Sequence, residues 1–185
     1  MKPEELKDLL EQHHASSFGW AMSCCGRDPA EAEDILQVVY LKVLEGRARF
    51  EGHATFKTWL FAVIRKTASD QRRKNVLRAV HTLKAAQQWA HSETAEHPDE
   101  TAYRAEVLMK FRRALVQLSR RQREVLELVF YHDLNIQEAA DVMGVSLGSA
   151  RTHYERGKKR LRQLIEESEV YESEWGRRKN PATVP

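Results

Sequence analysis

Apolar residues recur at three- and four-residue spacing along most of the chain. Between residues 119 and 165 they form two short stripes on either side of a glycine. The first stripe contains Ile136, Ala139, Ala140 and Met143, and the second contains Leu147, Ala150, Tyr154, Leu161 and Leu164. This spacing places each set on one face of an α-helix. The pattern therefore predicts two consecutive helices that each bury one side.

The residues around these stripes indicate where each helix begins and ends. Asn135 is a preferred N-cap residue type, and Glu138 three positions later completes a capping box. Gly144 supplies the positive φ that ends the first helix, and Ser146 caps the second. Two capped helices joined by a tight, glycine-containing turn predict a helix-turn-helix motif.

The second of these helices carries a polar, basic face opposite its apolar stripe. At about 100° per residue, the outward positions are Gly148, Ser149, Thr152, Glu155, Arg156, Lys159 and Arg160, with Arg151 and Lys158 at the flanks. Hydroxyls and cations on one helical face suit the major groove of DNA, where arginine reads guanine. The alternative is a solvated basic helix in an ordinary helical bundle.

A strong helix start, Asp28-Pro29-Ala30-Glu31, opens the most apolar helix of the first half, which runs to Gly46. Its apolar positions go most of the way round, which is typical of a helix that is fully buried or forms part of a protein interface. Asp34, Gln37 and Leu41 lie along one edge. The two polar residues are either part of such an interface or ordinary surface residues.

The next helical pattern, TFKTWLFAVIRKTASDQRRK, begins with Thr55 as its cap and places Phe56, Trp59, Leu60 and Val63 on one side. Its second half carries the cations Arg65, Lys66, Arg72, Arg73 and Lys74. Aromatic residues followed by cations suit single-stranded nucleic acid, whose bases stack and whose phosphates need neutralising. The alternative is that Trp59 is a core residue and the cations form a solvated face.

Composition limits the class of protein. The 185 residues are 42% hydrophobic and 31% charged with a net charge of +3, which predicts a soluble globular protein whose nucleic-acid affinity comes from local patches. No apolar run approaches the roughly 18 residues of a membrane span, and the acidic start is unlike a signal peptide. We expect a cytoplasmic protein without membrane insertion. Cys24 and Cys25 are adjacent, as are His13 and His14, so their spacing favours structural roles over a metal site, and no cofactor is predicted.

These patterns predict an all-α chain of two small helical domains joined by a flexible linker. The stretch HSETAEHPDET at 91–101 is polar, acidic and broken by Pro98. We place a first domain at 1–75, the linker at 76–104, a second domain at 105–168 and a tail at 169–185. A further helical pattern begins at Tyr103 and leads to a capping box at Ser119 and Gln122.

With both halves in view, the chain resembles the extracytoplasmic-function (ECF) sigma factors of bacterial RNA polymerase. DPAEAEDILQVVYLKVLE, TFKTWL and the basic helix are similar to the family's region two, within residues 5–74. LSRRQREVLELVFYHDLNIQEAADVMGVSLGSARTHYERGKKRLR is similar to its region four, within residues 105–165. The resemblance implies a subunit that is not an enzyme and that binds core polymerase and promoter DNA, with an anti-sigma protein as a further partner.

The resemblance also implies roles for individual residues. Core-polymerase binding falls to Asp34, Gln37 and Leu41. Recognition of the −10 element falls to Phe50, His53, Thr55, Phe56, Trp59, Arg65, Lys66, Arg72, Arg73 and Lys74. Recognition of the −35 element falls to Ser146, Ser149, Arg151, Thr152, Glu155, Arg156, Lys158 and Lys159.

The chain departs from the family pattern at Lys66, where asparagine is usual, and at Gly157, where alanine is usual. A glycine inside a helix costs about 1 kcal/mol. A homodimeric helix-turn-helix regulator of transcription is the alternative interpretation of the whole chain. The basic-aromatic helix after Thr55 argues against that alternative, because a dimeric regulator has no need of it.

Overall fold

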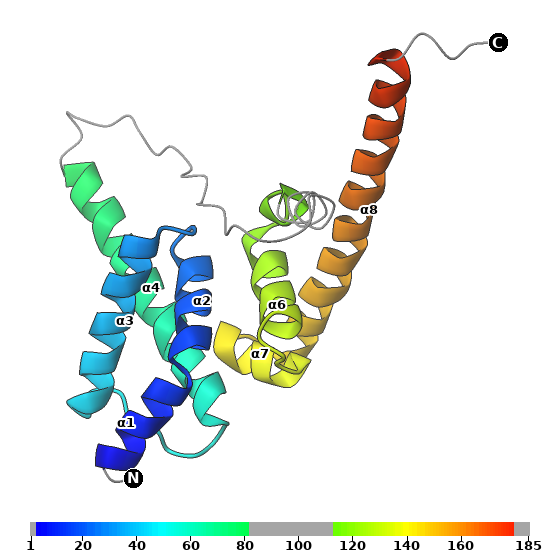
Figure 1. Ribbon diagram of the computed structural model, residues 1–185. Helices are drawn as coiled ribbons and strands as arrows, with labels where there is room; N and C mark the ends of the chain where they lie inside the picture. The colour runs from blue at the N-terminus through cyan, green and yellow to red at the C-terminus, as the bar shows by residue number, and fades with distance from the viewer. Residues whose placement is uncertain (1–2, 82–112, 180–185) are drawn as a thin grey trace.

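The computed structural model describes residues 3–81 and 113–179, and every regular element within these ranges is a helix (Figure 1). In chain order the elements are α1 (Pro3–Gln12), α2 (His14–Cys24), α3 (Pro29–Leu44), α4 (Phe56–His81), α6 (Arg120–Phe130), α7 (Ile136–Met143) and α8 (Leu147–Lys179). Residues 113–116 are also helical. The predicted all-α class is confirmed.

Two helices extend past the predicted segment ends. α4 continues to His81, beyond the expected boundary at residue 75, and α8 continues to Lys179, well inside the expected tail. Proline first recurs at Pro181, and the glutamate-rich stretch after residue 165 has good helix propensity, so α8 has no reason to stop at 168. Most of the expected linker, and the helical pattern from Tyr103 to residue 112, lie outside the described residues.

In the N-terminal half, residues 3–81, helices α2, α3 and α4 pack against one another, and α1 lies against α2 and α3. The largest fully buried side chains of this half include Trp20, Leu60, Phe61 and Ile64. α3 begins as predicted, because the Asp28 carboxylate accepts hydrogen bonds from the main-chain N–H groups of Ala30 and Glu31 at 2.9 and 3.1 Å. The helix ends at Leu44, shortly before Gly46 adopts a φ of +70°.

In the C-terminal half, residues 113–179, helices α6, α7 and α8 pack against one another. The predicted capping box of α7 is present: Asn135 accepts from Glu138 N at 3.0 Å, and Glu138 accepts from Asn135 N at 2.9 Å. Gly144 has a φ of +62° and ends α7. Ser146 Oγ accepts from Ser149 N at 3.2 Å at the start of α8. The helix-turn-helix is thus built by the local chemistry that the sequence indicated.

Helices α6 and α8 approach each other closely at Gly157, which is buried. A Cβ at this position would lie 3.1 Å from Gln122 Cβ and 3.2 Å from Leu126 Cδ1. Both distances are shorter than ordinary van der Waals contact. Gly157 therefore has a packing role that its helix propensity does not reveal.

The two halves are in contact, chiefly through α7, which packs against α4. Figure 1 shows α7 at the junction between the bundle of α2 and α4 and the pair α6 and α8. The polar residues of α8 are exposed, so the contact between the halves leaves them uncovered.

Candidate nucleic-acid interface

Helix α8 exposes its polar face along its first four turns. Of the predicted apolar stripe, Ala150, Leu161 and Leu164 are buried and Leu147 and Tyr154 are half-buried, and Gly157 on the same side is also buried. The outward positions are all exposed: Gly148, Ser149, Arg151, Thr152, Glu155, Arg156, Lys158, Lys159 and Arg160. The predicted division of this helix into a buried stripe and a solvent face is confirmed.

Hydrogen bonds and ion pairs hold some of these polar side chains. Ser146 Oγ and Ser149 Oγ lie 2.9 Å apart, and Thr152 Oγ1 donates to the Gly148 carbonyl at 2.9 Å. Lys158 Nζ lies 3.6 Å from Glu155 Oε2 and 5.1 Å from the centre of the Tyr154 ring. Arg156 forms no ion pair with any residue in the described parts of the chain, so its guanidinium is available to a ligand.

An aromatic cluster lies where the 50–56 loop meets α4. Phe50, Phe56 and Trp59 pack with ring centres 5.3 to 5.5 Å apart, and His13 stacks on Phe56 at 5.8 Å. Thr55 caps the helix by accepting from Thr58 N at 3.2 Å. Phe56 is buried, whereas Phe50 and Trp59 remain partly exposed. The cluster fixes the loop on the helix and leaves His53 at its exposed tip.

Of the four residues that the sequence places on one side of α4, two are buried and two are partly exposed. Phe56, Leu60, Phe61, Ile64 and Ala68 are the buried apolar residues, whereas Trp59 and Val63 lie at the edge of the core. A partly exposed Trp59 is consistent with either of the two roles that the sequence left open.

The cations of α4 fall into two groups. Lys66, Arg73 and Lys74 are exposed. Arg65 has only 16% of its side chain exposed and lies 3.2 Å from the Glu124 carboxylate of α6. Arg72 donates from Nη2 to the Cys24 carbonyl at 2.5 Å. Arg65 is therefore largely enclosed by the protein, whereas Arg72, like Lys66, Arg73 and Lys74, is an exposed residue.

The outer edge of α3 is both apolar and exposed. Asp34 and Gln37 are solvent-facing, and Val38, Leu41 and Leu44 are 43%, 52% and 56% exposed. The opposite side of the helix is buried through Ile35, Leu36, Val39 and Val43. An exposed row of large aliphatic residues beside two polar ones is typical of a protein-docking surface.

The contact between the halves contains residues that the sequence analysis missed. The ring of His132, in the turn between α6 and α7, lies edge-on to Trp20 at 5.8 Å and to Phe61 at 4.9 Å. Lys57 Nζ donates to the His132 carbonyl at 2.5 Å. Burial, reinforced by the nearby Lys57 charge and opposed by Asp133, lowers the pKa of His132 to about 4, so the ring is neutral at pH 7.

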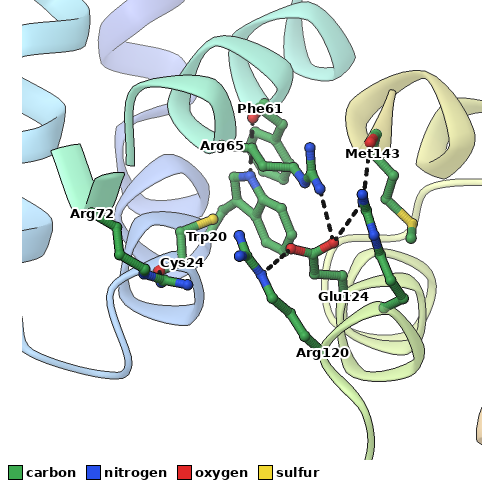
Figure 2. Close-up of polar contacts among 9 residues, drawn as sticks. Trp20, Cys24, Phe61, Arg65, Arg72, Arg120, Glu124 and Met143 are labelled. Atoms are coloured by element: carbon green, nitrogen blue, oxygen red, sulfur yellow. Dashed lines mark hydrogen bonds and ion pairs between the residues drawn. The ribbon is translucent and has the colours of Figure 1, made fainter. Parts of the chain in front are cut away.

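Two carboxylates of α6 face the same contact. Glu124 receives Arg65, Arg120 and Arg121 (Figure 2). Glu127 lies 3.7 Å from Arg27 of the N-terminal half, and its burial raises the pKa of the carboxyl despite nearby arginines. The sequence did contain a signal for these residues, since Glu124 directly precedes the apolar run VLELVF and Glu127 interrupts it, but that signal did not specify their partners.

Four residues raised the question of a metal site. Cys24 and Cys25 are free and buried, and burial raises the thiol pKa of both, that of Cys25 to about 12. His13 stacks on Phe56, and His14 Nδ1 lies 3.0 Å from the Tyr40 hydroxyl. Residues 3–81 and 113–179 contain no group of three or more His, Cys, Asp or Glu side chains arranged to hold a metal.

Across the same ranges, no helix combines the length and apolar character needed to cross a membrane.

Comparison with known proteins assigns both halves. The Sigma-70 region 2 family model matches residues 9–78, and the Sigma-70, region 4 model matches residues 108–161. The ECF RNA polymerase sigma factor SigX of Bacillus subtilis is 34% identical over 143 residues, which cover 76% of this chain and 73% of SigX. The RNA polymerase sigma factor CarQ of Myxococcus xanthus is 29% identical over 167 residues, covering 90% and 92%.

Solved structures share the fold. The sigma factor RpoE from Bartonella quintana, solved with the anti-sigma factor NepR, matches with a TM-score of 0.70 at 23% identity, covering 88% of this chain and 98% of that one. CnrH, solved with the cytosolic domain of CnrY, matches with a TM-score of 0.60 at 19% identity, covering 89% and 90%.

A helix-turn-helix half joined to a second helical half with a basic helix defines a promoter-recognition protein. The chain belongs to the sigma-70 family, in its ECF group of RNA polymerase sigma factors. It directs core RNA polymerase to promoter DNA, and the alternative of a homodimeric helix-turn-helix regulator is set aside.

Proposed function

We propose that this sigma factor divides promoter recognition between three surfaces: α8 reads the −35 element, the 50–56 loop with α4 engages the −10 element, and the outer edge of α3 docks on core polymerase. The observation that carries the proposal is the exposed polar face of α8 on a capped helix-turn-helix whose apolar stripes are buried. A helix presented in this way fits the major groove.

At the −35 element, Arg156 and Thr152 lie one helical turn apart at the centre of the exposed face. Arg156 suits bidentate pairing with guanine, and Glu155 suits a cytosine amino group. Arg151, Lys158 and Lys159 flank this axis and suit phosphates. Ser146 and Ser149 lie at the N-terminus of α8, where exposed main-chain N–H groups favour a phosphate oxygen.

At the −10 element, the partly exposed Phe50 and Trp59 suit base stacking, and Lys66, Arg73 and Lys74 suit the strand's phosphates. His53 and Thr55 are both exposed and lie in the 50–56 loop, which precedes α4. Phe56 supports the platform from below, since it is buried. Arg65 and Arg72 belong to the same surface, and they join the strand once their contacts within the protein are released.

On core polymerase, we propose that Leu41 and its exposed aliphatic neighbours supply the apolar contact of α3, while Asp34 and Gln37 supply direction through hydrogen bonds. The chain itself performs no chemistry in this scheme and acts in the cytoplasm. Its relatives RpoE and CnrH were solved with an anti-sigma factor and with CnrY, respectively, and we propose an anti-sigma partner for this chain too.

Transcription in vitro with core polymerase tests the proposal, with sequencing of transcript ends to locate the promoter elements. Lys66→Ala is the sharpest variant for the −10 surface, because Lys66 is exposed and its loss does not disturb the core. The variant is expected to impair a duplex promoter more than one whose −10 region is already unpaired. Lys7→Ala removes another exposed lysine, on α1, and is the control. Equal losses on both templates, or a loss in the control, would contradict the −10 assignment.

A further inference from the structure

His13 lies at the turn between α1 and α2, where the local helix geometry gives no reason for a histidine. It occupies the N-cap position of α2 with a φ of −97° and a ψ of 4°, and its side chain accepts no hydrogen bond from the main chain of that helix. Serine, threonine, asparagine and aspartate are the residues that stabilise an N-cap. The role of the His13 ring therefore lies outside its own helix end.

The His13 ring instead contacts the aromatic cluster of Phe50, Phe56 and Trp59. It stacks on Phe56 with ring centres 5.8 Å apart and ring planes inclined by 26°. Phe50 and Trp59 contact the same Phe56 ring, with centres at 5.5 and 5.3 Å. Phe56 is buried, whereas each of the three rings around it is partly exposed. His13 thus takes the same place relative to Phe56 as the two rings already proposed to stack on DNA bases.

The ring nitrogens of His13 are without a hydrogen-bond partner within residues 3–81 and 113–179. The hydrogen bonds of this residue are made by its main chain, whose carbonyl accepts from Ser16 Oγ at 3.0 Å and from Ser17 N at 2.9 Å. Burial and the nearby Lys57 charge lower the pKa of His13, so the ring is neutral at pH 7. A neutral imidazole carries one donor and one acceptor nitrogen.

The geometry points to His13 as a further residue of the −10 surface, which reads the edge of an unpaired base through its ring nitrogens while Phe56 holds the ring in place. The inference rests on the proposed role of Phe50 and Trp59 at the −10 element. Stacking on those two rings accepts any base, because every base has a π-face. The phenylalanine ring has no hydrogen-bonding atom, and the indole has only a donor. Of these three partly exposed rings, His13 can therefore discriminate best between bases.

A separated DNA strand offers the groups that His13 lacks in the free protein. An unpaired base can be read by hydrogen bonds to its Watson–Crick edge. Because the His13 ring is already held by stacking on Phe56, it loses less conformational freedom on binding than an unsupported side chain. The exposed cations of α4 suit phosphates, which carry no sequence information. His13 thus adds base selection to a surface whose other members supply affinity.

Three substitutions separate base reading from stacking and from folding. His13→Phe keeps a ring on Phe56 and removes both ring nitrogens. His13→Asn removes the ring and introduces a preferred N-cap residue at the start of α2, so the new cap should offset the lost stacking and keep the midpoint of urea unfolding near that of the wild type. His14→Phe is the matched control, because His14 is the exposed neighbour and its Nδ1 contacts the Tyr40 hydroxyl at 3.0 Å.

The measurements use the full-length chain assembled with core RNA polymerase. The template is a promoter whose −10 region is held unpaired, with the non-template strand randomised across that region, and sequencing of the bound templates gives the base preference at each position. We expect His13→Phe to bind the pool about as tightly as the wild type and to lose about two- to tenfold of the discrimination at one position, which is the contribution of a hydrogen bond. His13→Asn should lose the discrimination at the same position, because its shorter side chain is no longer held on Phe56. His14→Phe should keep every preference of the wild type.

The outcomes separate this inference from the −10 assignment on which it rests. Unchanged base preferences in both His13 variants overturn the inference, and so does a loss of the same size in His14→Phe. Phe50→Ala, in the same assay, tests the assignment itself and should weaken binding of all sequences about fivefold or more, as the loss of one stacked base does. If Phe50→Ala binds the unpaired template as tightly as the wild type, the proposed stacking surface fails and the inference fails with it. If Phe50→Ala binds weakly while the His13 variants keep their preferences, the inference alone fails.

Discussion

The indole of Trp20 donates from Nε1 to the main-chain carbonyl of Phe61 at 3.0 Å, and the two rings stack with centres 5.9 Å apart. This pair ties α2 to α4 at the centre of the N-terminal half, where both side chains are fully buried. The carbonyl belongs to α4, the helix that carries the proposed −10 surface. The position of that surface therefore depends on a core contact.

Two replacements of Trp20 are expected to lower the free energy of unfolding by different amounts. Trp20→Phe keeps a stacked ring and loses the indole hydrogen bond, which costs about 1 to 3 kcal/mol. Trp20→Ala also leaves a cavity and should cost about 3 to 5 kcal/mol. Urea unfolding measures both. Phe130→Ala, at a half-exposed aromatic residue, is the control and should cost less than about 1 kcal/mol. Similar losses at both aromatic positions would show that the Trp20–Phe61 pair is not central to the fold.

A pair of glycines in α8 should respond differently to alanine. At Gly148 an added Cβ meets nothing within 4 Å, so Gly148→Ala should stabilise the helix by up to about 1 kcal/mol. At Gly157 the same gain is opposed by contacts of 3.1 and 3.2 Å with Gln122 and Leu126. We expect Gly157→Ala to give no net gain and Gly157→Val to cost about 1 to 3 kcal/mol. Urea unfolding checks the order, and a Gly157→Ala gain equal to that of Gly148→Ala would contradict it.

The starts of α3, α7 and α8, the end of α7 and the two faces of α8 could be predicted because they depend on residues close together in the sequence. Asp28, Asn135 and Ser146 cap the main-chain groups two or three residues away. Gly144 ends α7 through its own φ. The exposed face of α8 follows from helical geometry once its buried stripe is recognised.

The junction between the halves could not be predicted in the same way. Glu124 and Arg65 are 59 residues apart, and Lys57 and His132 are 75 apart. Nothing in the spacing of either residue specifies the other. Gly157 was interpreted only as a loss of helix propensity, because its contact with Gln122 arises when α6 and α8 pack together. Both the junction and the packing role of Gly157 depend on contacts between residues that are far apart in the sequence.

The outer edge of α3 gives a prediction for polymerase binding. Asp34 and Gln37 are exposed, so replacing both by alanine should leave the unfolding free energy within about 0.5 kcal/mol of the wild type. The double variant should nevertheless bind core polymerase about tenfold less tightly, if each side chain contributes a hydrogen bond of about 0.5 to 1.5 kcal/mol. Fluorescence anisotropy with labelled sigma factor measures this affinity. Glu11→Ala with Gln12→Ala, an exposed pair on α1, is the control. Unchanged affinity in the Asp34 and Gln37 variant would show that these two side chains on the outer edge of α3 do not contribute to binding of core polymerase.

Acid should weaken the packing around His132. Its folded pKa of about 4 lies below the unfolded value of 6.5, so unfolding takes up a proton between these two values. The stabilising contribution is fully present above pH 6.5 and falls as the pH drops toward 4, with a loss of about 2 kcal/mol at pH 5. Glu127 acts in the opposite sense, because its pKa is raised and the folded state gains from its protonation.

His132→Phe isolates the histidine contribution, since it keeps an aromatic ring beside Trp20 and Phe61 and cannot titrate. Urea unfolding at pH 7 and pH 5 should show the wild type losing about 2 kcal/mol more than the variant. Glu127 is present in both proteins, so its effect cancels in the comparison. Parallel pH dependence in the two proteins would show that His132 is protonated as easily when folded as when unfolded.

The last prediction concerns base reading by α8. Arg156 lies at the centre of the exposed face, free of ion pairs with the described residues, whereas Lys158 lies to the side, beside Glu155 and over the Tyr154 ring. A centrally placed guanidinium can pair with guanine and discriminates against other bases by about 1 to 3 kcal/mol. A lysine at the flank meets phosphates, which fix position without reading sequence.

Binding of the full-length protein to a duplex library randomised at the −35 element, at two salt concentrations, separates the two roles. Arg156→Ala should flatten the preference at one or two base pairs and leave the others intact. Lys158→Ala should weaken all sequences alike and reduce the slope of log affinity against log salt by about one unit. Because both variants remove one positive charge from the same helix, they control for each other. A uniform loss in Arg156→Ala, with the base preferences unchanged, would make Arg156 a phosphate contact and leave base reading to Thr152 and Glu155.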